Sequence, residues 1–150
     1  MPYYTTLKVR IYDADLEQYI SSPYANVYFY VTFDGENFDS GKLTQTDPQG
    51  YAYIDFDPDC SYSIGIQKWK VKIADSDAYY KNVSSINYTL TIYSQLIPQV
   101  IYPNGDAFEV GKLIPINVSL VDDCNYVNNA NVNIRVRYLT TTYSCSPVNN

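Results

Sequence analysis

Apolar and polar side chains alternate strictly through most of this chain, and this alternation limits what it can fold into. Five segments each carry one apolar row and one polar row, namely residues 7–12, 27–33, 51–56, 68–73 and 87–92. Successive side chains of a β-strand point to opposite faces, so such segments suit antiparallel strands that are covered on one side. A helical period of 3.6 residues is nearly absent. The sequence therefore predicts an all-β fold.

Turn signals separate these segments at short intervals. Asp34-Gly35 is the pair that tight hairpins favour, and Asp47-Pro48-Gln49-Gly50 combines a proline corner with a closing glycine. Short strands divided by such turns predict an antiparallel β-sandwich. Trp69 falls on the apolar row of its segment and is expected to pack in the core.

Composition excludes several functions. The net charge of −6 argues against a nucleic-acid partner, because phosphate binding needs a basic surface. The chain has no histidine, which excludes Ser-His and Cys-His nucleophile pairs and His-ligated metals. No apolar run approaches the roughly 20 residues of a membrane-spanning helix. The carboxylate pairs Asp57 with Asp59 and Asp75 with Asp77 suit turns better than catalysis, so no enzyme is predicted.

The cysteines and the Asn-X-Ser/Thr triplets bear on the compartment. Cys60, Cys124 and Cys145 are the candidates for disulfides, and three of them allow at most one internal bridge. They are either ordinary buried cysteines or include one whose partner lies outside this chain. Glycosylation triplets begin at Asn82, Asn87 and Asn117, the last two on the polar faces of expected strands. These triplets favour an extracellular, cell-surface protein.

A weak internal repeat sets the expected domains. Val9, Ile11 and Asp13 lead through a loop to Ala25-Asn26-Val27, and Val118, Leu120 and Asp122 lead to Ala130-Asn131-Val132 in the same way. The two alanines stand 105 positions apart, which is a usual sandwich-domain length. We expect a complete sandwich over residues 1–97, a proline-containing linker over 98–104, and the first strands of a second, incomplete sandwich over 105–150.

The segments Ala25-Asn26-Val27-Tyr28-Phe29 and Thr46-Asp47-Pro48-Gln49-Gly50-Tyr51-Ala52 resemble the tandem immunoglobulin-like, prealbumin-like repeats of bacterial and archaeal cell-surface proteins. Tyr143-Ser144-Cys145-Ser146-Pro147 is similar to a stretch of such surface repeats, often archaeal, in which a second cysteine follows. That second cysteine is missing here. The resemblance implies an immunoglobulin-like sandwich that serves as a spacer, an adhesin or a layer component.

Two weaker site hypotheses concern calcium and sugars. If strand directions alternate, Asp13, Asp15, Glu17, Asp47, Asp75 and Asp77 gather at one end of the sandwich, where their oxygens could hold calcium. Tyr28, Tyr30, Tyr51 and Tyr53 fall on outward faces and form the candidate ligand face. The alternative for these tyrosines is cross-strand pairing without a ligand.

The expected function is that of a non-enzymatic structural or adhesive module of a cell-surface protein, working with other copies or domains of that protein. One alternative is a subunit of a surface filament or surface layer assembled by strand exchange. In that alternative the N-terminal strand, residues 4–12, completes the second domain of a neighbour. A second alternative is a carbohydrate-binding module that uses the tyrosine face.

Overall fold

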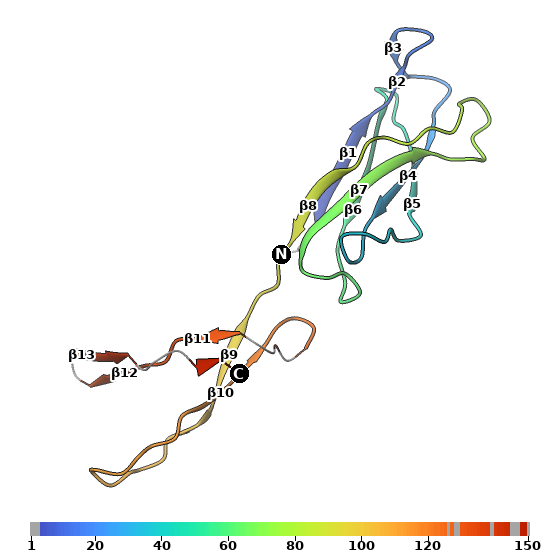
Figure 1. Ribbon diagram of the computed structural model, residues 1–150. Coiled ribbons are helices and arrows are strands. Elements are labelled where there is room, and N and C mark those ends of the chain that lie inside the picture. The colour runs from blue at the N-terminus through green and yellow to red at the C-terminus, as the bar shows by residue number, and fades with distance from the viewer. Residues whose placement is uncertain (1–3, 126, 128–129, 139, 145–147, 150) are drawn as a thin grey trace. The chain divides into compact units, whose positions relative to one another are not determined.

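The computed structural model describes residues 4–125, 127, 130–138, 140–144 and 148–149. These residues form antiparallel strands and no helix, so the all-β prediction is confirmed (Figure 1). The chain divides into two compact units, Met1–Tyr93 and Ser94–Asn150, called unit 1 and unit 2 below.

Unit 1 is an antiparallel sandwich. Its strands are β1 (Thr5–Arg10), β2 (Tyr12–Asp13), β3 (Gln18–Tyr19), β4 (Asn26–Val31), β5 (Lys42–Gln45), β6 (Tyr51–Phe56), β7 (Gly65–Ile73) and β8 (Tyr88–Ile92). One sheet has the order β5-β4-β7-β8 and faces the two-stranded sheet β1-β6, while β2 and β3 form a small hairpin. Each of the five predicted segments lies on one of β1, β4, β6, β7 and β8.

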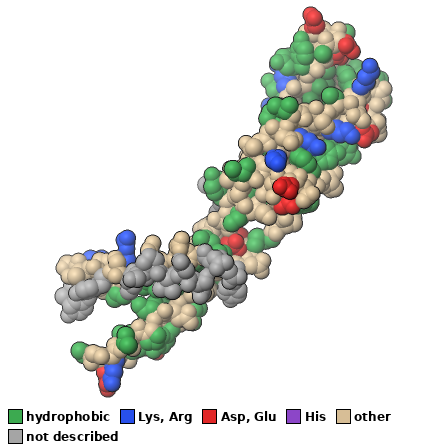
Figure 2. Space-filling view, in the orientation of Figure 1, with side chains coloured by type: hydrophobic (Ala, Val, Ile, Leu, Met, Phe, Trp, Pro, Cys, Tyr) green, Lys and Arg blue, Asp and Glu red, His purple; other side chains and the backbone are tan. Residues whose placement is uncertain are grey.

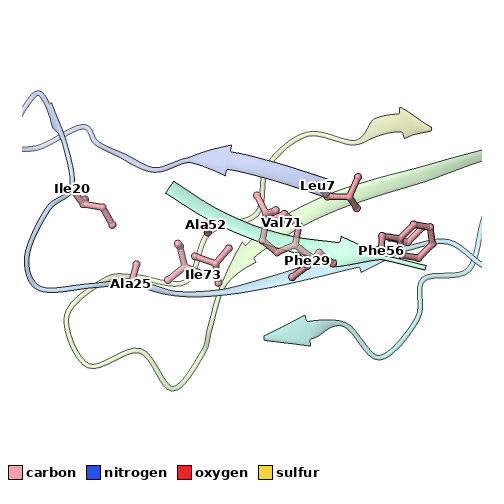
Figure 3. Packing of buried hydrophobic residues seen from close by; sticks show 11 residues of the cluster. Leu7, Ile20, Ala25, Phe29, Ala52, Phe56, Val71 and Ile73 are labelled. Atoms are coloured by element: carbon pink, nitrogen blue, oxygen red, sulfur yellow. The ribbon is translucent and has the colours of Figure 1, made fainter. Parts of the chain in front are cut away.

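The core of unit 1 lies between these two sheets. Burial alternates along β4 and β6 as the sequence pattern predicts, and the inward residues of both strands are at most 7% exposed. Figure 3 shows Leu7 and Ala52 from one sheet close to Phe29, Val71 and Ile73 from the other. Each large apolar side chain buried in this way contributes roughly 1.5–3 kcal/mol relative to exposure.

Unit 2 consists of two-stranded ladders. Its strands are β9 (Ile97–Tyr102), β10 (Asn117–Val121), β11 (Asn131–Val132), β12 (Arg135–Tyr138), β13 (Thr141–Ser144) and β14 (Val148–Asn149). β9 pairs with β10, β11 with β14, and β12 with β13, all antiparallel. Large apolar side chains of this unit stay exposed, among them Val100, Val110 and Leu113, and hydrophobic side chains reach the surface of unit 2 in Figure 2.

The structure bears on two expectations, one in each unit. Most of the expected linker, residues 98–104, belongs to strand β9. Pro98 is tolerated in β9 because this strand has only one partner among the described strands. The N-terminal strand, expected as a donor, pairs with β6 along its whole length and buries Leu7. Its removal would open the core of unit 1.

Candidate functional site

The loop acids of this protein bind the backbone of their own loops. A carboxylate oxygen of Asp13 accepts hydrogen bonds from the N–H groups of residues 15 and 16 at 3.0 and 3.1 Å. Asp34, Asp77 and Asp122 bind the N–H groups two and three residues further on in the same way. This arrangement supplies partners for N–H groups that the strands leave unpaired.

Two further calcium candidates, Asp47 and Asp75, also have partners within unit 1. Asp47 accepts the N–H groups of Gln49 and Tyr51, both at 2.9 Å. Asp75 pairs with the ammonium of Lys72 at 2.8 Å and with the side-chain amide of Asn82. Within the part of the chain that the structure describes, no three acidic or cysteine side chains gather in a group that could hold a metal ion. The expected convergence of Asp13, Asp15, Asp47, Asp75 and Asp77 is therefore not found there.

Hydrogen bonding also shifts the acidity of these groups. The N–H and side-chain amide of Asn37, with the N–H of Glu36, lower the pKa of Asp34 to about 2. The hydroxyl and N–H of Ser61 lower the pKa of Asp59. Burial alone would raise the pKa of Asp77, but N–H groups of residues 26, 79 and 80 together hold it below its usual value.

We expect the stability of unit 1 to fall in acid because of these carboxylates. Their folded-state pKa values lie below the ordinary value, so the stability that they add is present above about pH 4 and is lost as the pH falls toward about 2. Urea midpoints followed by tyrosine and tryptophan fluorescence should be flat from about pH 7 to 5 and drop below about pH 4. Asp77→Asn should flatten this drop, while Asp15→Asn, at an exposed loop acid, should not. A midpoint that rises on acidification would contradict this reasoning.

The four candidate ligand tyrosines do not share one face. Tyr28 and Tyr30 lie on β4, whose inward residues Val27, Phe29 and Val31 point into the core, so the tyrosines face outward from the four-stranded sheet. Tyr51 and Tyr53 face outward from the opposite sheet, on β6. The two pairs therefore lie on opposite outer faces of unit 1.

Both tyrosine pairs have partners within unit 1. The rings of Tyr28 and Tyr30 stack at 5.8 Å, and the ammonium of Lys8 lies 4.0 Å from the centre of the Tyr51 ring. The guanidinium of Arg10 lies 3.7 Å from the Tyr19 ring and 5.0 Å from that of Tyr51. Such contacts stabilise a sheet surface without a ligand.

A polar cleft of about 420 Å³ opens between β5 and β6 in unit 1, and sequence reasoning did not find it. The hydroxyl of Tyr62 donates to Asp39 at 2.8 Å in its wall, and Asp39 also accepts the N–H groups of Val31 and Gly41. Burial, with the neighbouring Asp39 carboxylate, raises the pKa of Tyr62, which keeps its hydroxyl protonated at neutral pH. The pair thus holds the loop in place, and it lacks the activated group of a nucleophile.

The glycosylation candidates are all exposed. Asn82 lies in the β7–β8 connection, Asn87 directly precedes β8, and Asn117 is the first residue of β10. Exposure is what a glycan requires, although the side-chain amide of Asn82 also donates to Asp75. Cys60 and Cys124 are disulfide-bonded, and Cys145 lies outside the described residues. The pairing of the three cysteines stays a prediction.

Unit 2 contains an apolar groove of about 190 Å³, called the unit-2 groove below. Its lining includes Ile116, Val118, Leu120, Val127, Ala130 and Val132. These residues come from β10, from the following loop and from β11, and none of those that the structure describes is fully buried. An apolar surface of this kind is the best candidate for an interaction site in the chain.

Comparisons with known proteins give no relative. No family model, no curated protein and no solved structure matches this chain. Among the described residues there is no helix of the length and apolarity needed to cross a bilayer.

Proposed function

We propose that this chain is a non-enzymatic, extracellular structural or adhesive module of a cell-surface protein. The observation that carries the proposal is the use of loop carboxylates as backbone partners. In unit 1, Asp13, Asp34, Asp47 and Asp77 all hold their own loops. Loops fixed in this way make a stiff sandwich, and stiffness suits a module that spaces or presents other parts of a protein.

The exposed glycosylation triplets support the same proposal. Asn87 and Asn117 stand at strand ends with exposed side chains, where a glycan would project without disturbing the core. Basic and acidic side chains lie on the outer surface of unit 1 in Figure 2, as expected for a solvated module.

The test is surface labelling of intact cells of the source organism with a membrane-impermeant biotin reagent. We expect this protein to be labelled on intact cells, while a cytosolic marker is labelled only after lysis. Tryptic peptides that contain Asn87 or Asn117 should have masses above those of the bare sequence. Labelling that appears only after lysis would overturn the extracellular assignment.

A second candidate is a subunit that assembles with neighbours by strand exchange. The unit-2 groove and the two-stranded ladders around it favour this candidate, because isolated hairpins are marginally stable and gain from added strands. For a carbohydrate-binding module the structure offers no such support, since the tyrosine pairs lie on opposite faces.

A further inference from the structure

Unit 2 repeats the hydrogen bonding of the first part of unit 1. The N–H of Ile20 donates to the carbonyl of Ile11 at 3.2 Å, and the N–H of Val127 donates to that of Leu120 at 3.0 Å. Between these partners, Asp13 in one unit and Asp122 in the other accept the N–H groups two and three residues on. Ile11 and Leu120 occupy the same place in the sequence repeat.

The next strand pair is repeated as well. In unit 1, Asn26 and Val27 of β4 pair with Gln45 and Thr44 of β5. In unit 2, residues 131 and 132, again Asn-Val, pair with residues 149 and 148 of β14. Unit 2 therefore repeats the contacts that unit 1 makes after β1 and at the start of β4.

The repeat shows which residues of unit 1 correspond to the unit-2 groove. Groove residues Val118, Leu120, Val127, Ala130 and Val132 correspond in order to Val9, Ile11, Ile20, Ala25 and Val27. These five belong to the core of unit 1 or pack against it.

In unit 1 this surface is covered by later strands. The inward residues of β6 and β7 pack against this surface and are at most 8% exposed, namely Ala52, Ile54, Phe56, Val71 and Ile73. β6 lies along β1, with Ile54 opposite Leu7 and Ala52 opposite Val9. In unit 2, β10 pairs with β9 along one edge, and no described strand lies along the other.

We propose that the unit-2 groove binds an extended strand of a partner protein, and that this strand has the apolar alternation of β6. The β6 of this chain is fixed in unit 1 by six paired residues, and the described strands of unit 2 all lie in ladders of their own. The incoming strand pairs with the free edge of β10 and sets alternate small and large apolar side chains into the groove. This role refines the structural function proposed above and rests on it.

The test uses the full chain and a fluorescein-labelled synthetic peptide of residues 49–57, which contains β6. We expect saturable binding by fluorescence anisotropy. A control peptide with Ala52→Ser, Ile54→Ser and Phe56→Ser should bind at least tenfold more weakly. In the protein, Leu120→Asp in the groove should weaken binding at least tenfold, whereas Leu113→Asp, at a 98% exposed residue of the same unit outside the groove lining, should leave it unchanged.

Equal binding of the two peptides, or no binding, would overturn the proposal, and this comparison needs no protein variant to fold. The second experiment measures self-association of the full chain by sedimentation. Self-association that Leu120→Asp abolishes would show that a second copy fills the groove instead. Neither result affects the surface-labelling experiment. Strand binding by the unit-2 groove and the extracellular function can therefore be refuted independently.

Discussion

Phe29→Ala is expected to lower the free energy of unfolding of unit 1 by about 3–5 kcal/mol. Phe29 is 1% exposed at the centre of β4 and is the largest fully buried side chain among the residues that the structure describes. Its ring lies nearly parallel to that of Trp69, with centroids 6.2 Å apart and 7° between the planes. Truncation leaves a cavity between the two sheets that their paired strands cannot close without shifting.

The measurement is urea denaturation followed by the fluorescence of Trp69, the one tryptophan in the chain, with circular dichroism as a second probe. Tyr28→Ala is the matched control, because Tyr28 is the neighbour on the same strand and faces outward. It should cost about 1 kcal/mol or less. Equal losses for the two variants would mean that the core does not lie between these sheets.

Much of unit 1 could be predicted from the period of two alone. The rows containing Val27, Phe29 and Ile54 point inward as expected, and Trp69 packs against the core. β5 was not predicted, because it is an edge strand whose single large apolar residue, Leu43, is 51% exposed. Without a covered face, a strand leaves no alternation in the sequence.

The candidate sites were harder to predict. The alternation predicts the face of the strand on which a side chain lies, but not the sheet to which that strand belongs. Tyr30 and Tyr53 both face outward as expected, yet their strands belong to opposite sheets. Likewise, the acids were expected at one end of the sandwich, but their short side chains reach the N–H groups of their own loops first. The correspondence between the unit-2 groove and part of the unit-1 core becomes visible only when the hydrogen bonds of the two units are compared.

One polar residue of the core did leave a signal in the sequence. Gln67 belongs to the inward row that continues through Trp69, Val71 and Ile73, so its position alone predicts a buried amide that needs partners. The structure supplies them. The Gln67 side-chain oxygen accepts the hydroxyl of Thr32 and the N–H of Gly35, each at 2.7 Å, and its nitrogen donates to the carbonyl of Ser63 at 2.7 Å.

Gln67→Leu is therefore expected to destabilise unit 1 by about 2–4 kcal/mol, although it places an apolar side chain at a site that is 1% exposed. Leucine has similar size but leaves the buried Thr32 hydroxyl and the Gly35 N–H without their acceptor. Each buried polar group left unpaired costs about 1–3 kcal/mol. Urea midpoints give the total, and hydrogen exchange should show faster exchange at the Gly35 amide in particular.

Gln45→Leu is the matched control for this substitution, because Gln45 is exposed on the edge strand β5. It should change stability by less than about 0.5 kcal/mol. A Gln67→Leu protein as stable as the native one would mean that leucine burial offsets the lost hydrogen bonds. The amide would then be a feature that the core tolerates. The expected loss would instead make Gln67 the polar link that holds the loops around Gly35 and Ser63 to the end of β7.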